Sequence, residues 1–244
     1  MNKFFAKKQK DLTFSFYDND INHILNVLRL TINDKIIVFF DSKKYICKII
    51  NLSPLLAMIL EEIPNNSELD ETKITVFQAI IKPKNFELVL TKATELGANY
   101  FYPVIFNRTQ FNNIEKHDRY EKIIYAACKQ CGRTNIPKIN PKISFKDMMS
   151  LFIDYDYVVV ANEYDSNSSN DLLSYLLESN INNNTNIAIV VGPEGGFSDD
   201  ELKTLSNIKN INFVGLTKSI LKSETATCYM LSILVSYFIH KGNQ

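Results

Sequence analysis

After Lys73 the sequence alternates short, almost continuously apolar runs with amphipathic helical patterns, and this alternation constrains the fold more than any other feature. In the clearest helical pattern, Phe86, Val89, Leu90 and Ala93 share one face, and Gly97 follows as a C-terminal stop. Strands that are apolar on both faces and are separated by helices are typical of a mostly parallel sheet. We therefore predict an α/β domain with such a sheet. Its expected strands are Ile74–Ile81, Tyr100–Ile105, Tyr157–Ala161, Ile187–Val191 and Ile211–Val214.

Two further helices are predicted, one from about Arg119 to Gln130 and a last one from about Ser223 to Ile239. The last pattern is apolar nearly all round, so we expect this helix to be buried on more than one side or to pack against another subunit. Its apolar stretch is shorter than the ~20 residues of a membrane span and contains polar side chains. A buried helix is therefore favoured over a membrane helix.

The first part of the chain has a different pattern. Between Phe4 and Ile63, β-rich runs such as Lys35–Phe40 and Tyr45–Ile50 are broken by turn-forming Asn-Asp and Asp-Ser pairs. One helical pattern, Asp20 to Leu30, interrupts them. These features predict a small β-barrel.

A polar, acidic stretch without periodicity, Pro64–Thr72, has the character of a connection between domains. We therefore predict two domains, a barrel at residues 1–68 and an α/β domain at residues 73–244. The Asn/Ser-rich stretches Asn162–Asn170 and Asn180–Asn186 are interpreted as solvated loops.

Charge and composition limit the partners. The 244 residues include 27 basic and 27 acidic side chains, so no whole-molecule field attracts nucleic acid or a membrane, and any such binding needs a local patch. The first residues contain no apolar run of signal-peptide length, so we expect a cytoplasmic protein.

The glycine-rich turn, Gly192–Phe197, is the strongest functional signal. Three of the chain's seven glycines lie in it directly after an apolar run, and their missing side chains let a ligand approach the main chain. Ser198 and Glu201 then form a capping-box pattern, which predicts a helix start. The glycine spacing fits neither a P-loop nor a dinucleotide fingerprint, while Glu194 would tolerate a cationic ligand. We therefore favour a ligand-binding turn over a plain structural one.

Cys128 and Cys131 form a C-x-x-C motif. Zinc or redox chemistry would require a second ligand pair or a thioredoxin-like strand context, and the sequence contains neither. Both cysteines fall on a helical pattern, so we interpret them as small residues packed on a helix and expect no metal site.

Many residues in order along the chain match one known family. They are His23 with Val27-Leu28-Arg29, Lys82, Lys92–Gly97, Pro103, Arg108, Ala126-Ala127, Gln130, Gly132-Arg133, Pro137, the glycine-rich turn with Ser198, Ile220-Leu221 and Glu224–Ala226. With them the chain resembles, over its whole length, the RsmE-type ribosomal RNA methyltransferases of the SPOUT class. These proteins methylate N3 of a uridine in 16S rRNA with S-adenosylmethionine.

The resemblance implies an N-terminal PUA-like barrel that helps to hold RNA and a C-terminal α/β domain tied in a deep trefoil knot, a rare exception to the rule against knots. It also implies a homodimer that acts on 16S rRNA or the small ribosomal subunit. The methyl donor would be held largely by main-chain groups of two segments. The residues expected to bind it are Val191, Gly192, Gly196, Leu216, Thr217, Ile220 and Leu221.

Some positions depart from the family pattern. Where the family usually has Leu-Gly-x-Arg-Ile-Leu-Arg, this chain has Leu216–Lys222, so that Thr217 replaces a glycine and Ser219 and Lys222 replace arginines. Lys222 keeps the positive charge without the bidentate fork of arginine. Lys129 stands where the family usually has an acid.

The RNA contacts expected from the resemblance are basic or aromatic-heterocyclic side chains from both predicted domains. A solvated charged face is the alternative for each of them. The expected RNA-binding residues are His23, Arg29, Lys82, Lys129, Arg133 and Lys138.

For catalysis we expect Glu224, at the start of the last helix, to orient or deprotonate the base. Arg108 or Arg133 would stabilise the developing uridine anion or bind a phosphate. Glu224 as a simple helix-start residue, favoured by the helix dipole, is the alternative.

Two other functions stay open. The chain could be a non-catalytic RNA-binding or ribosome-assembly factor that keeps the fold, since a fold does not guarantee a function. It could also be a related knotted methyltransferase with another RNA target.

Overall fold

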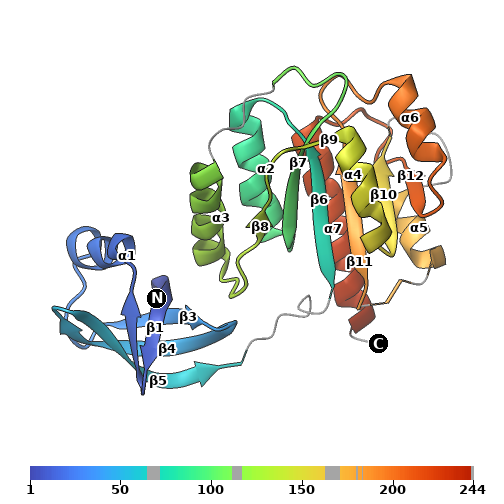
Figure 1. Ribbon diagram of the computed structural model, residues 1–244. Coiled ribbons are helices and arrows are strands. Elements are labelled where there is room, and N and C mark those ends of the chain that lie inside the picture. The colour runs from blue at the N-terminus through green and yellow to red at the C-terminus, as the bar shows by residue number, and fades with distance from the viewer. Residues whose placement is uncertain (65–71, 112–116, 163–170, 180, 183, 243–244) are drawn as a thin grey trace. The chain divides into compact units, whose positions relative to one another are not determined.

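The structure, a computed structural model, describes residues 1–64, 72–111, 117–162, 171–179, 181–182 and 184–242 (Figure 1). The chain divides into two compact units, Met1–Ser67 together with Cys128–Ile136, and Glu68–Ala127 together with Pro137–Gln244. Most of the predicted connection Pro64–Thr72 and of the predicted loop Asn162–Asn170 lies outside the described residues.

The first unit contains a closed barrel, as the sequence predicts, and its strand order is β1-β2-β5-β4-β3. A parallel pairing of β1 with β3 closes it, and the other pairings are antiparallel. Side chains alternate along β4, where Tyr45, Cys47 and Ile49 are buried in the barrel core. The strands are β1 (Lys3–Lys10), β2 (Thr13–Phe16), β3 (Lys35–Phe40), β4 (Lys43–Leu52) and β5 (Leu55–Ile63).

The predicted helix Asp20–Leu30 is shorter and less regular than expected. It forms α1 (Asp18–Asn22) followed by a π-helical turn, η1 (His23–Val27). The buried carboxylate of Asp20 lies 2.8 Å from the ammonium of Lys129, which also approaches the ring of Phe4. Both partners belong to the first unit, so this ion pair ties the segment Cys128–Ile136 to the barrel.

The second unit contains a sheet of seven strands in the order β12-β10-β11-β6-β7-β8, with β9 also pairing with β7. Every pairing among its described strands is parallel, as predicted. The two short strands β8 and β9 have no counterpart in the sequence prediction. The strands are β6 (Lys73–Ala79), β7 (Tyr100–Ile105), β8 (Lys138–Ile139), β9 (Ile143–Ser144), β10 (Tyr157–Ala161), β11 (Asn186–Val191) and β12 (Ile211–Val214).

Helices cover both faces of this sheet (Figure 1). On one face, α4 (Phe145–Leu151) and α6 (Asp199–Ser206) bury Met148 and Leu205 against β-strand side chains such as Val190. On the other, α7 packs against β6 and β11 and is flanked by α2 and α5. The remaining helices are α2 (Pro83–Glu95), α3 (His117–Cys131), the 3-10 turn η2 (Phe152–Asp154), α5 (Leu172–Ser179) and α7 (Ser223–Gly242).

The three predicted helices correspond to α2, α3 and α7. Helix α2 ends at Glu95, and Gly97 adopts a positive φ of 93°, which explains why a glycine stops the helix there. Met230, Leu231, Leu234 and Phe238 of α7 are fully buried. None of the helices that the structure describes is long and apolar enough to cross a membrane.

Removal of the Asp20 carboxylate by Asp20→Ala should destabilise the first unit. A buried charged hydrogen bond that loses one partner costs about 1–3 kcal/mol or more. Chemical denaturation should therefore give a lower free energy of unfolding than for Asp18→Ala, which removes an exposed carboxylate from the same helix. Equal effects of the two substitutions would show that the pair contributes nothing specific.

Candidate methyl-donor site

The carboxyl ends of three neighbouring parallel strands open into a cavity of about 370 Å³. Ala161 and Asn162 line it at the end of β10, the glycine-rich turn lines it after β11, and residues 216–217 and 219–223 line it after β12. Ligands of open α/β sheets bind outside the carboxyl ends of the strands, so the position is that expected of a binding site. We call it the strand-end cavity. All seven residues predicted to bind the donor line it, namely Val191, Gly192, Gly196, Leu216, Thr217, Ile220 and Leu221.

The glycine-rich turn has little room for side chains. A Cβ atom on Gly192 would lie 3.1–3.3 Å from ring atoms of Phe197, and Gly196 adopts a φ of 68°. Either constraint disfavours a larger residue, because the first position is crowded and the second has left-handed backbone. The predicted capping box follows, since Ser198 accepts from the Glu201 amide while Glu201 accepts from the Ser198 amide.

A buried polar network fixes the turn to the sheet and to the last helix. The Ser223 hydroxyl donates to the Gly192 carbonyl at 2.7 Å and accepts from the Gln78 side-chain amide at 2.8 Å. Thr227, one turn further along α7, donates to the other side of the Gln78 amide. Gln78 and Thr227 are fully buried, so these bonds form in surroundings where an unpaired amide would be costly. Two members of this network, Gly192 and Ser223, line the strand-end cavity.

Arg108 lies on a short loop, Phe106–Thr109, that packs on the glycine-rich turn; we call it the Arg108 loop. Arg108 Nη1 donates to the Gly195 carbonyl at 3.1 Å, and the Phe106 and Phe197 rings meet edge to face with centroids 5.3 Å apart. The predicted catalytic arginine is therefore next to the turn that lines the strand-end cavity.

Glu224 is the second residue of α7, between two cavity-lining residues, Ser223 and Ala226. Its Oε2 atom is buried and has no hydrogen-bond partner among the described residues. Burial raises the pKa of the Cys228 thiol one turn away, and the charges of Lys92, Glu224 and Glu95 also act on that thiol. Lys92 and Glu95 belong to α2, which packs against α7.

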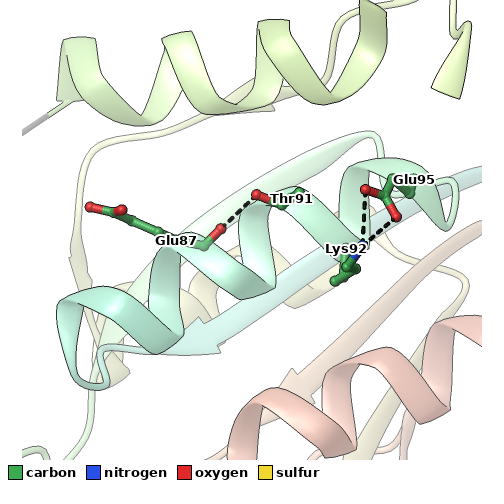
Figure 2. A network of polar contacts seen from close by, with 4 residues as sticks. All are labelled: Glu87, Thr91, Lys92 and Glu95. Carbon is green, nitrogen blue, oxygen red and sulfur yellow. Dashed lines mark hydrogen bonds and ion pairs between the residues drawn. The ribbon is translucent and has the colours of Figure 1, made fainter. Parts of the chain in front are cut away.

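Figure 2 shows this part of α2, where the Lys92 ammonium contacts both carboxylate oxygens of Glu95 at 3.2 and 2.9 Å. One turn earlier, the Thr91 hydroxyl donates to the Glu87 carbonyl at 2.9 Å. The Lys92–Glu95 pair is half-exposed and contributes little to stability by itself.

The other predicted site residues are spread over both units. Arg29 is exposed with a φ of 54° after η1, and Lys82 and Lys138 are exposed in the second unit. Partly buried His23 packs edge to face against the Phe4 ring at 6.0 Å. Arg133 is half-buried in the first unit. Lys129 is engaged with Asp20, so an RNA phosphate would have to compete with a carboxylate for it.

Several cavity and turn residues were missed by the sequence prediction. Asn107 donates to Ser198 and Glu201, although 91 and 94 residues separate them, and Gln78 contacts Ser223 over a separation of 145 residues. Hydrophobic periodicity along the sequence does not indicate contacts between residues that are so far apart. Ala161 and Asn162 could have been found, because both follow a predicted strand at its carboxyl end.

Cys128 of the C-x-x-C motif is buried on α3, and its thiol lies 3.9 Å from the Asn135 carbonyl. Burial raises the pKa of this thiol to about 12. Among the described residues, the side chains close enough to share a metal ion are His117, Asp118 and Glu121, and neither cysteine of the motif belongs to that group.

The chain matches two known domain families. The RNA methyltransferase domain family matches residues 68–235, and the RNA methyltransferase PUA domain family matches residues 16–57. The fold and the strand-end cavity therefore belong to an RNA methyltransferase with a PUA domain.

Full-length relatives define the class further. The ribosomal RNA small subunit methyltransferase E of Rickettsia conorii is 30% identical, with 86% of this chain and 83% of that protein covered. The protein of the same name from Mesomycoplasma hyopneumoniae is 29% identical over 95% of this chain and 98% of its own length. A crystal structure of the Neisseria gonorrhoeae protein of that name, bound to S-adenosyl methionine, matches with a TM-score of 0.81, 26% identity and 97% coverage of both chains. This chain belongs to the ribosomal RNA small subunit methyltransferase E family.

Alkylation of the native protein should distinguish the two cysteines of the motif. Only thiolates react, so iodoacetamide at about pH 8 should leave Cys128 unmodified and label the exposed Cys131. Peptide mass spectrometry before and after unfolding measures this. Equal labelling of both cysteines in the native protein would contradict a buried structural role for Cys128.

Proposed function

We propose that this protein transfers a methyl group from S-adenosylmethionine to N3 of a uridine in the 16S rRNA of the small ribosomal subunit. The observation that carries the proposal is the strand-end cavity, where residues from three strand ends surround a turn built for main-chain contact. Membership of the methyltransferase E family supports the choice of substrate.

The cavity residues fit the donor. A volume of about 370 Å³ falls within the range of small-molecule sites, roughly 300–1,000 Å³. Gly192 and Gly196 leave main-chain groups accessible, while Leu216 and Leu221 supply apolar lining from the opposite segment. Glu194 and Lys222 both line the cavity, which suits a ligand that carries a positive and a negative group. When bound there, S-adenosylmethionine supplies an activated methyl group.

The residues around the cavity would supply the rest of the chemistry. N3 of uridine carries a proton that must leave, and the unpartnered Oε2 of Glu224 can accept it or orient the base. A positive charge would stabilise the uridine anion that develops, and Arg108 offers one beside the glycine-rich turn. Arg133, in the first unit, is proposed as a further contact to the anion or to a phosphate. The target base must be unstacked to reach such a site.

RNA binding by a neutral chain requires local basic patches. We propose His23 and Arg29 of the first unit and Lys82 and Lys138 of the second as contacts, with Lys129 contributing where RNA displaces it from Asp20. We also propose that the protein acts in the cytoplasm as a homodimer and that the α/β domain contains a trefoil knot.

Loss of the protein should abolish one modification. Mass spectrometry of small-subunit rRNA from cells with and without the gene should show N3-methyluridine only when the protein is present, and purified protein with the donor should restore it. Methylation at another RNA position would favour a different target. Donor binding without any transfer would favour the non-catalytic assembly factor.

Glu224→Gln removes the proposed proton acceptor with almost no change in volume. Turnover should fall by about 10²–10⁴-fold, while the donor dissociation constant measured by calorimetry changes little. The matched control is Asp118→Asn, which also removes a first-turn carboxylate, in this case from α3. If Glu224 only favours the helix start, both variants will keep full turnover.

A further inference from the structure

Glu201 has a second set of contacts besides the capping box. Its side chain is buried, with 2% of its surface exposed. One oxygen, Oε2, accepts from the amide and the hydroxyl of Ser198 at 2.8 and 3.0 Å. The other oxygen, Oε1, accepts from the main-chain amide of Asn107 at 2.7 Å. The cap of α6 needs only the first oxygen, so the second is free to serve another purpose.

Asn107 is the residue immediately before Arg108, and it is held at two points. Its main-chain amide binds Glu201, and its side-chain amide donates to the Ser198 hydroxyl at 2.9 Å. The Arg108 loop is closed internally, because Thr109 accepts from the Phe106 amide through its hydroxyl and donates its own amide to the Phe106 carbonyl. The loop is therefore a compact unit whose position depends on its contacts with the glycine-rich turn.

We propose that Glu201 is a positioning residue that sets the register between the Arg108 loop and the glycine-rich turn. It thereby couples donor binding to the presentation of Arg108 to RNA. This inference rests on the proposed function for the role of Arg108, whereas the loop geometry stands independently of it.

The chemistry of a carboxylate explains why a glutamate suits this position. Three donors converge on its two oxygens, and charged acceptors make hydrogen bonds roughly twice as strong as neutral ones. A glutamine would have one oxygen and one NH₂ group. Whichever way its amide is turned, either the Asn107 amide or the Ser198 amide would face another donor.

Arg108 and the glycine-rich turn are coupled because they are in close contact. The Cβ of Arg108 lies 3.3 Å from the position of a Cβ on Gly195, and Arg108 Nη1 binds the Gly195 carbonyl. A shift of the loop by a few tenths of an ångström therefore moves Arg108 relative to the turn. Misplacement of a charged group by about 1 Å can lower a rate by about a hundredfold.

The test is a double-mutant cycle with Glu201→Gln and Arg108→Ala. We expect Glu201→Gln to lower kcat by about tenfold to a hundredfold with a donor dissociation constant within about threefold of the wild type. In the Arg108→Ala background, Glu201→Gln should lower kcat no further, since the two residues act as one unit. If the kcat of the double variant falls by the product of the two single losses, the proposal is overturned.

The matched control is Asp200→Asn. It removes an exposed carboxylate from the first turn of the same helix, and Asp200 lies outside the strand-end cavity. Its turnover should equal that of the wild type. If Asp200→Asn lowers kcat as much as Glu201→Gln, general charge loss at the helix start accounts for the effect and the proposal fails.

Two measurements keep the test decisive if Glu201→Gln folds poorly or the wild type is inactive. Asn107→Ala leaves Glu201 intact but removes the side-chain contact of the loop with Ser198. We therefore expect a smaller loss of kcat than for Glu201→Gln, and no further loss when Arg108 is already replaced by alanine. Hydrogen exchange at the Asn107 amide should be slow in the wild type and faster in Glu201→Gln; unchanged exchange refutes the positioning role. If the wild type transfers no methyl group, only the proposed function is refuted. The double-mutant cycle is then measured on rRNA affinity. If the two substitutions weaken rRNA binding by factors that multiply in the double variant, the coupling is again refuted.

Discussion

The hydroxyl of Ser223 is the contact on which the rest of the site depends. It donates to the carbonyl of Gly192 and accepts from Gln78, and in this way it joins the glycine-rich turn, the central strand β6 and the first residue of α7. Gln78 and Ser223 are buried, so a broken link between them would leave a buried polar group without a partner. The hydrogen bond from Ser223 therefore attaches the first residue of the glycine-rich turn to the first residue of α7.

Much of the fold could be predicted because its signals are local. The apolar runs of β7, β10 and β12 have the same limits in the sequence and in the structure, because each is a short, mainly apolar run. Residues Ile143–Ser144 of β9 and Lys138–Ile139 of β8 are too short for any periodicity. The π-helical turn at His23 follows a helix of only five residues, and a helix pattern does not distinguish the two.

The part of the candidate site that is formed by main-chain groups could be predicted from the sequence. The glycine-rich turn and its capping box are contiguous in sequence, so residue types alone located them. The side chains that hold the turn in place are not contiguous with it. Gln78 and Asn107 reach it because parallel strands bring their carboxyl ends to one edge of the sheet, and that arrangement depends on strand order, which periodicity does not report. For the same reason the ion pair of Lys129 with Asp20, two residues 109 positions apart, could not be predicted from the sequence.

The proposed main-chain recognition of the donor would also explain how the segment opposite the turn can depart from the family pattern. The hydroxyl of Thr217 donates to the Ser219 carbonyl at 2.6 Å, so this side chain satisfies a group of its own loop and leaves the loop amides unchanged. The side chain of Ile220 is 80% exposed, so little of it packs against the protein. A donor held by peptide groups is insensitive to which side chains those residues carry, provided that the backbone keeps its path. The path is set at both ends, by the strand β12 before Leu216 and by the Ser223 network after Lys222. Under the proposed main-chain recognition, substitutions between these two anchors would change the surroundings of the donor more than its attachment.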